Sequence, residues 1–145
     1  MIPIYIVDAS VVVKWFSDIK EQDRQQALWI RDRSLEDKIH LIAPDLIVYE
    51  LANALRYNPS FEANETKKAI KAFLDFGIII EFGEMLDKVV RDAIKIAYQF
   101  NITVYDSLYV ALAKKYQCKL ITANPKCHSR VKTKNIILLK YFKIK

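Results

Sequence analysis

Glycine is scarce in this chain, with two residues in 145. Phosphate-binding loops of the P-loop and dinucleotide types need several closely spaced glycines, so both kinds of nucleotide site are excluded. Histidine and cysteine also number two each, and they do not supply the ligands and spacing of a tetrahedral zinc site. With so few histidines and no nucleophile elbow, a serine or cysteine hydrolase is disfavoured. We expect Cys118 and Cys127 to be buried or idle thiols.

Long apolar runs are missing as well. No stretch approaches the roughly 20 apolar residues of a membrane span, and the chain reaches Asp8 without the basic leader of a signal peptide. We therefore expect a cytoplasmic protein with no membrane contact. The content of 52% hydrophobic and 28% charged residues is that of a globular protein. Because 145 residues is the size of one domain, we expect a single domain over residues 1–145.

Acidic residues are absent from the C-terminal end of the sequence. Residues 126–145 carry seven basic side chains, whereas residues 1–125 carry 16 basic and 17 acidic ones, and the formal net charge is +6. Lys126, Arg130 and Lys132 are therefore candidates for binding a polyanion such as RNA. The same positive charge could instead protect a terminal strand from pairing with other chains.

Short apolar runs alternate with helical patterns along the chain. We expect strands at 4–7, 40–43, 78–81, 120–122 and 136–139. Helices are expected at 10–16, 21–35, 46–57, 64–77, 86–100 and 106–116, with a short helical or irregular piece at 124–130. This alternation implies right-handed crossovers and a parallel sheet. The predicted fold class is α/β, a three-layer α/β/α sandwich with a central parallel sheet of about five strands.

Polar residues stand where ligands bind in such sheets, at the C-terminal ends of the strands near the reversal of strand order. Asp8 ends the first expected strand, Asp106 opens the helix before the fourth, and Thr122-Ala-Asn124 ends the fourth. Glu50 interrupts an apolar helix, where an unpaired charge would be costly to bury. It lies near these polar residues if that helix leans over the same edge of the sheet. Hard cations such as Mg²⁺ and Mn²⁺ prefer carboxylate oxygen, so a shared site would bind metal.

Each acid also has an ordinary structural explanation. Asp8 can serve the start of the following helix. The segment from Thr103 to Asp106 matches a capping box. Glu50 can lie on a solvated helix face that it shares with Asn53. The joint placement of the acids at one sheet edge is what favours a site.

In order and spacing, four segments resemble a known family, the PIN-domain proteins of the kind that serve as VapC toxins of toxin–antitoxin pairs. They are Val7-Asp8-Ala-Ser10; Ala43-Pro-Asp-Leu with Glu50-Leu-Ala-Asn53-Ala-Leu; Tyr105-Asp106-Ser-Leu-Tyr-Val-Ala-Leu-Ala; and Leu120-Ile-Thr122-Ala-Asn124. The segment from Tyr105 to Ala113 is the most specific of the four. Any one of them alone would be a weak signal.

This resemblance implies a metal site and a catalytic site made of Asp8, Glu50 and Asp106, with Ser10 and Thr122 as supporting hydroxyls. It also implies Mg²⁺- or Mn²⁺-dependent cleavage of RNA phosphodiesters, a cognate antitoxin protein and a homodimer. Asn53, on the face of Glu50, is expected to order a ligand or a water. Asn124 departs from the family, whose members commonly carry a fourth acid there. An amide offers a carbonyl oxygen without charge, so a second metal should bind less firmly.

Two other functions stay open. A PIN fold with weakened catalysis could bind RNA or a partner protein, and Asn124 is the feature that favours this alternative. A receiver-type phosphoacceptor domain shares the architecture and binds Mg²⁺. That class expects two adjacent acids after the first strand, where Asp8 stands alone.

Overall fold

The computed structural model describes residues 1–81 and 85–143, and these are arranged around one parallel sheet. Its strands are β1 (Ile4–Val7), β2 (His40–Pro44), β3 (Ile79–Glu81), β4 (Lys119–Thr122) and β5 (Ile136–Leu138). They lie in the order β3-β2-β1-β4-β5, and every neighbouring pair is parallel. The predicted five-stranded parallel sheet is confirmed.

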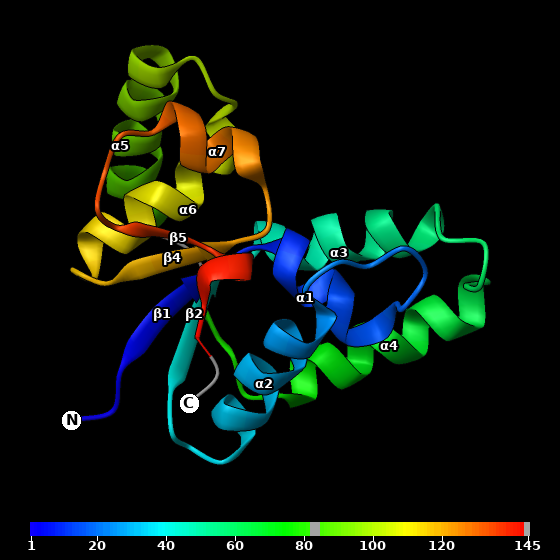
Figure 1. The fold of residues 1–145 in the computed structure, drawn as a ribbon. Helices are drawn as coiled ribbons and strands as arrows, with labels where there is room; N and C mark the ends of the chain where they lie inside the picture. The colour runs from blue at the N-terminus through cyan, green and yellow to red at the C-terminus, as the bar shows by residue number, and fades with distance from the viewer. Residues whose placement is uncertain (82–84, 144–145) are drawn as a thin grey trace.

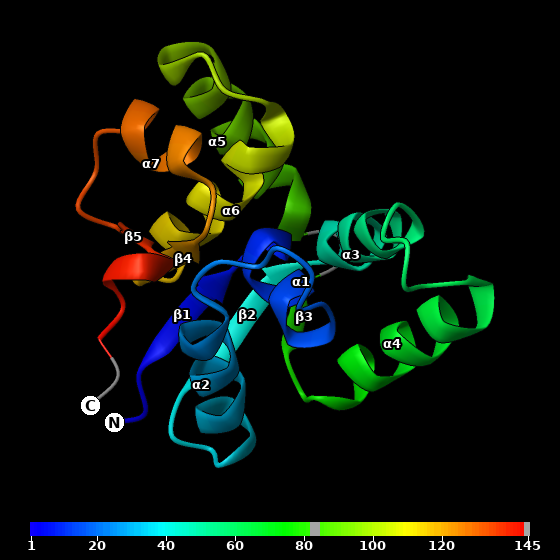
Figure 2. The same ribbon diagram turned by 45° about the vertical axis from the view of Figure 1, so that its right-hand side comes forward.

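Helices cover both faces of this sheet (Figures 1 and 2). One group comprises α1 (Ala9–Phe16), α2 (Arg24–Leu35), α3 (Leu46–Arg56) and α4 (Ala63–Asp75), and the other comprises α5 (Met85–Phe100), α6 (Val104–Lys115) and α7 (Pro125–Arg130). A 3-10 turn at Leu139–Tyr141 follows β5. Right-handed crossovers explain why the helices divide between the two faces. The chain adds strands toward one side of the sheet from β1 to β3 and toward the other side from β4 to β5. The three-layer α/β/α sandwich is confirmed.

The order of the strands reverses between β1 and β4. From β1 the chain adds β2 and β3 on one side, and it then adds β4 and β5 on the other. Connections leave this point in opposite directions, so the C-terminal ends of β1 and β4 border the crevice where ligands bind in open parallel sheets. Val7 pairs with Ile121 in the register of these strands. Asp8 directly follows β1, and Thr122 is the last residue of the neighbouring β4. Both therefore lie at the same edge of the sheet.

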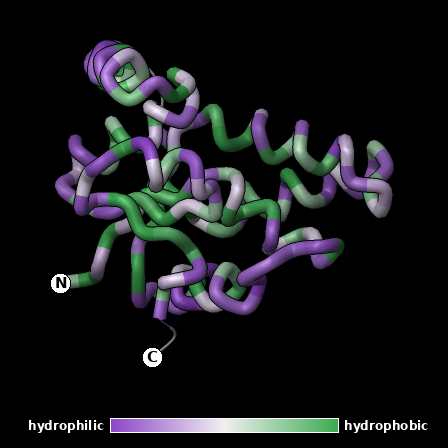
Figure 3. The backbone as a smooth tube through the Cα atoms, turned by 45° about the horizontal axis from the view of Figure 1, so that its top comes forward, coloured by the Kyte–Doolittle hydropathy of each residue, from purple (hydrophilic) through white to green (hydrophobic). Residues whose placement is uncertain are grey.

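Burial on both faces explains the apolar sequence of the central strands. Ile6, Val7, Leu120 and Ile121 are fully buried, as is typical of strands covered on two sides. Residue hydropathy along the backbone agrees with this burial, because the central strands are hydrophobic and the outer helices are more hydrophilic (Figure 3). Helix α6 is buried over most of its length and contacts β1, β2 and β4. Its position across three strands fixes its first turn at the edge that carries Asp8.

Several helix boundaries differ from the sequence-based expectation. Helix α6 begins at Val104, two residues before the expected start, because the Thr103 hydroxyl accepts a hydrogen bond from the backbone N–H of Asp106 at 3.0 Å. Helix α4 begins at Ala63, where Glu62 and Glu65 form a reciprocal capping box. Helix α2 is shorter than expected and begins at Arg24. None of these shifts moves a strand.

Two further expectations concern the cysteines and the membrane. Cys127 is buried, Cys118 is half-buried, and both are free thiols. Across residues 1–81 and 85–143, no helix combines the length and the apolar character needed to cross a bilayer.

Candidate active site

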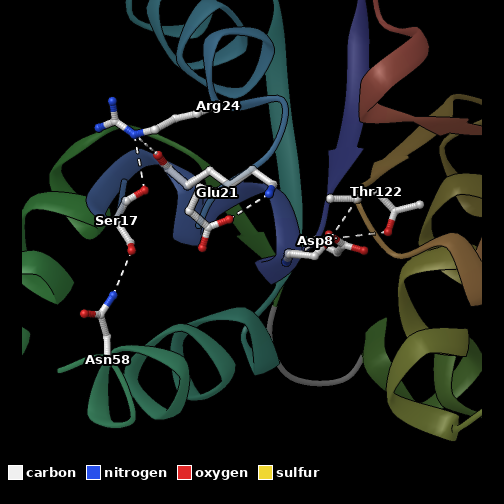
Figure 4. A network of polar contacts seen from close by, with 9 residues as sticks. Asp8, Ser17, Glu21, Arg24, Asn58 and Thr122 are labelled. Carbon is white, nitrogen blue, oxygen red and sulfur yellow. Dashed lines mark hydrogen bonds and ion pairs between the residues drawn. The ribbon is translucent and has the colours of Figure 1, made fainter. Parts of the chain in front are cut away.

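Asp8 ends β1 and also caps α1. Its Oδ1 atom accepts hydrogen bonds from the backbone N–H of Ser10, at 3.1 Å, and from the Ser10 hydroxyl. The hydroxyl of Thr122 lies beside the Ser10 hydroxyl (Figure 4). The interpretation of Asp8 as a helix cap is therefore confirmed. Capping occupies Oδ1 and leaves the carboxylate at the C-terminal edge of the sheet.

Two hydroxyl groups join the end of β1 to the end of β4. The Ser10 Oγ atom accepts a hydrogen bond from the backbone N–H of Ala123 at 2.9 Å and lies 3.4 Å from Thr122 Oγ1. Thr122 is fully buried, and its Oγ1 atom accepts a hydrogen bond from the backbone N–H of Asn124 at 3.0 Å. The structure thus brings the two expected supporting hydroxyls to Asp8.

Glu50 reaches the same edge from α3. Its Oε1 atom accepts a hydrogen bond from the hydroxyl of Tyr109 at 2.5 Å, and Tyr109 is 2% exposed on α6. Sequence reasoning did not single out Tyr109. The available signal was its spacing of three residues from Asp106, which puts both side chains on one face of a helix. Helix α3 therefore leans over the edge as the metal-site hypothesis requires.

Asp106 lies in the first turn of α6 and is half-buried. Among the residues that the structure describes, its carboxylate accepts no hydrogen bond; the capping contact at Thr103 involves its backbone N–H. Asp106 lines a cleft of about 400 Å³ together with Asn101, Ile102, Thr103, Asn124, Lys126, Cys127 and Arg130. The third acid is thus less constrained than Asp8 and Glu50.

The pKa values of these groups reflect a shared, partly dry environment. Burial raises the pKa of Asp8 from 3.8 to about 6, against the hydrogen bonds from Ser10 and Thr122, and the charge of Glu50 adds to the rise. Burial also raises the pKa of Glu50, with a further contribution from the charge of Asp106. The charge of Glu50 thus influences Asp8, and the charge of Asp106 influences Glu50. The three acids are close enough for their charges to interact.

The neighbours of the acids respond to the same charges. The pKa of the Tyr109 hydroxyl is raised above its usual range, first by burial and then by Glu50. Burial raises the pKa of the Cys127 thiol to about 12, with contributions from Asp106 and Asp8. Both side chains are therefore neutral at physiological pH. They act as a hydroxyl donor and an apolar wall beside the carboxylates.

The donor chemistry of this site fits a hard divalent cation. All three acidic side chains offer oxygen, which Mg²⁺ and Mn²⁺ prefer. A cation would offset both the burial of charge and the smaller repulsion that raise the pKa of Asp8 and Glu50. Within the described ranges, however, no three His, Cys, Asp or Glu side chains lie close enough together to hold an ion. The carboxylates would therefore have to close around a cation as it binds.

Comparison with known proteins places this chain in a family. A model of the PIN domain matches residues 5–134. The chain belongs to the PIN domain family. The curated relative Ribonuclease VapC3 of Pyrobaculum aerophilum is 29% identical over 120 residues, which span 81% of this chain and 86% of that protein.

Solved structures share the PIN fold at lower identity. The crystal structure of PAE2754 from Pyrobaculum aerophilum superposes with a TM-score of 0.65 at 22% identity, over 95% of this chain and 90% of that one. VapBC2 from Rickettsia felis, bound to a DNA fragment from their promoter, gives a TM-score of 0.63 at 18% identity, over 93% and 96% of the two chains. The fold of the PIN domain is thus found over nearly the whole chain.

The remaining residues that the sequence predicts to support the site or to bind RNA fall into two groups. Asn124 and Lys126 line the cleft that contains Asp106. Asn124 also caps α7, because its Oδ1 atom accepts a hydrogen bond from the backbone N–H of Lys126 at 3.0 Å. Arg130 lines the same cleft and donates a hydrogen bond to the carbonyl of Asn101 at 2.7 Å.

Lys132 and Asn53 lie apart from this cleft lining. Lys132 is exposed after α7, and Asn53 is exposed on α3, one turn beyond Glu50. In the part of the chain that the structure describes, the side chain of Asn53 makes no hydrogen bond. Its expected role in ordering a ligand stays a prediction, as does the contact of Lys132 with RNA.

Proposed function

We propose that this chain is an Mg²⁺- or Mn²⁺-dependent endoribonuclease that hydrolyses RNA phosphodiesters. The observation that carries the proposal is the half-buried Asp8 carboxylate, whose pKa is raised to about 6 by burial and by Glu50 at the switch point of the sheet. A strongly perturbed acid in such a position is typical of a functional site. The name of the curated relative VapC3, a ribonuclease, supports the same reaction.

In this proposal Asp8, Glu50 and Asp106 hold the cation. When bound, it supplies positive charge that lowers the pKa of a water molecule and offsets charge on the departing oxygen. The chain's own hydroxyls keep two of these acids in place, through Ser10 at Asp8 and Tyr109 at Glu50.

RNA would approach the acids through the cleft of Asp106. Lys126 and Arg130 line this cleft, and their positive charge would attract the phosphates next to the bond that is cut. The hydrogen bond to the Asn101 carbonyl holds the guanidinium of Arg130 at the cleft. A fixed cation there would favour one path for the backbone past the carboxylates.

We further propose that the enzyme is cytoplasmic and is the toxin of a toxin–antitoxin pair, inhibited by a cognate antitoxin. The likeness to the VapBC2 assembly supports this partner. We also propose a homodimer, which the exposure of Ile94 and Tyr98 one turn apart on α5 supports. A small adjacent gene for a DNA-binding protein would support the pairing, and equilibrium sedimentation would measure the dimer.

The catalytic proposal is tested with a panel of structured and single-stranded RNAs, incubated with the protein and either Mn²⁺ or EDTA. We expect cleavage with Mn²⁺, none with EDTA, and a loss of more than about 100-fold in Asp106→Asn, because even indirect partners of metal ligands cost 10–100-fold. The control is Asp87→Asn, which changes an exposed acid in the first turn of another helix. Cleavage that survives Asp106→Asn would contradict the proposal.

Asn124 favours a second candidate, an RNA- or protein-binding PIN domain with weakened catalysis. Its amide oxygen is engaged as the cap of α7, so the site offers three acids where a fourth would complete two metal positions. Metal-independent RNA binding without cleavage, in the same panel, would support this alternative.

A further inference from the structure

Hydroxyl groups hold two of the half-buried acids of the site, and each hydroxyl engages one carboxylate oxygen. Ser10 donates to Oδ1 of Asp8, and it belongs to the same turn of the chain. Tyr109 donates to Oε1 of Glu50 from a different helix, 59 residues away in the sequence. The carboxylate of Asp106 has no such partner among the described residues. The contact between Tyr109 and Glu50 is therefore the one that depends on the tertiary structure.

Tyr109 is well placed to fix the direction of a neighbouring group. Its ring is 2% exposed and belongs to the hydrophobic core, and α6 packs on β1, β2 and β4. A ring packed in this way has little freedom to move its hydroxyl. Glu50, in contrast, is a long side chain that would otherwise sample several rotamers. The hydrogen bond between them transfers the rigidity of the core to the glutamate.

A purely structural tyrosine would not need this arrangement. A phenylalanine of the same shape would fill the core, and it would leave no buried hydroxyl to satisfy. Hydrogen bonds to a charged acceptor are stronger and more directional than neutral ones. They are also a common means by which proteins orient the side chains that bind metals. The hydroxyl of Tyr109 thus serves Glu50 more than it serves the core.

We propose that Tyr109 is a positioning residue that holds Glu50 by Oε1 and so presents Oε2 to the divalent cation. Among the described residues, Oε2 accepts no hydrogen bond. This inference rests on the proposed function, since it assigns a role toward the cation of that site. In this inference Glu50 is held in one orientation, and Asp106, whose carboxylate accepts no hydrogen bond among the described residues, is the acid that would move most when a cation binds.

The test is a comparison of Mn²⁺ affinity in metal-free protein by calorimetry. Tyr109→Phe keeps the ring and removes the hydroxyl, and we expect it to bind Mn²⁺ about 10–100-fold more weakly than the wild type. Tyr116→Phe is the matched control, because it removes a hydroxyl that lies just beyond the other end of α6. We expect its affinity to stay within about twofold of the wild type.

A double-mutant cycle tests whether Tyr109 acts through Glu50. In a Glu50→Ala background, which removes the acceptor, Tyr109→Phe should change the remaining Mn²⁺ affinity by less than about twofold. An equal loss in both backgrounds would overturn the inference, and so would a Tyr109→Phe protein that binds Mn²⁺ like the wild type.

A measurement on the wild type keeps the inference testable if Tyr109→Phe fails to fold. A buried, hydrogen-bonded hydroxyl proton exchanges slowly with water, so its NMR signal should be visible and should persist when Mg²⁺ is added. Loss of the signal on Mg²⁺ binding would overturn the positioning role. Wild-type protein that cleaves RNA and binds Mn²⁺, beside an unchanged Tyr109→Phe, refutes this inference alone. Wild-type protein that does neither refutes the proposed function, and the inference with it.

Discussion

At the scale of single residues, Asp8 serves two opposing requirements. Its carboxylate caps α1 through Ser10, which favours the fold. The same carboxylate is partly removed from water beside Glu50, which disfavours its charged form. Sites that are arranged for chemistry commonly cost stability in this way. The balance between the two roles depends on pH.

We expect Asp8 to lower the stability of the metal-free protein at neutral pH. Its folded pKa of about 6 lies above the ordinary 3.8, so its contribution to stability is complete below pH 3.8 and is lost as the pH rises through 6, by up to about 3 kcal/mol. Asp8→Asn keeps an oxygen for the cap and carries no charge. Urea unfolding should show it more stable than the wild type at pH 7.5, by about 1–3 kcal/mol, with a smaller gap at pH 4.5.

The control for this pH dependence is Asp18→Asn, which changes an exposed acid beyond the end of α1. A gap between wild type and Asp8→Asn that is the same at both pH values would contradict the raised pKa. Added Mn²⁺ should narrow or reverse the gap at pH 7.5, because the cation stabilises only the form that binds it.

At the scale of elements, hydrogen bonds fix the far end of α1 as firmly as Asp8 fixes its start. The Arg24 Nε atom donates to the carbonyls of Lys14 and Ser17, at 3.1 and 3.2 Å. Asn58 donates from beyond α3 to the Ser17 hydroxyl at 2.7 Å, and Lys14 forms an ion pair with Glu21 at 2.7 Å (Figure 4). This cluster fastens α1 to α2 and α3 away from the candidate active site.

Arg24→Ala should therefore lower stability without affecting the metal site. It leaves the carbonyls of Lys14 in α1 and of the cap residue Ser17 without this donor, which costs about 1–3 kcal/mol in the free energy of unfolding. Mn²⁺ affinity should stay within about twofold, because Asp8 is held locally by Ser10 and by the end of β4. Arg31→Ala, which breaks an exposed ion pair with Asp32, should cost less than about 1 kcal/mol. A tenfold loss of Mn²⁺ affinity in Arg24→Ala would show that the two ends of α1 are coupled.

The elements themselves were largely predictable from the sequence, because apolar periodicity and local capping determine them. All five expected strands exist within one or two residues of their expected bounds, and the α/β/α layering follows from their alternation with helices. Helix starts were less accurate, since the caps at Thr103 and Glu62 were not both recognised. Placing Glu50 by Asp8 depended on the tilt of α3. That tilt and the contact with Tyr109 come from tertiary packing, which no local pattern specifies.

At the scale of the whole molecule, positive charge is distributed unevenly over the fold. Residues 126–145 carry basic side chains and no acids. Two of those residues, Lys126 and Arg130, line the cleft that contains Asp106. The sequence predicted a basic end beside a local acidic site, and the structure shows that α7 brings part of that end to the third acid.

RNA binding should therefore depend on salt mainly through α7. Each phosphate contact on a single strand contributes a slope of about 0.7 to the fall of log K with log salt concentration. In EDTA, which prevents cleavage, replacing both Lys126 and Arg130 with alanine should reduce this slope by about 1.4. Replacing Lys67 and Lys68, two exposed lysines on α4, removes the same charge elsewhere and should leave the slope nearly unchanged. An equal reduction in both variants would mean that net charge, and not the cleft beside Asp106, attracts the RNA.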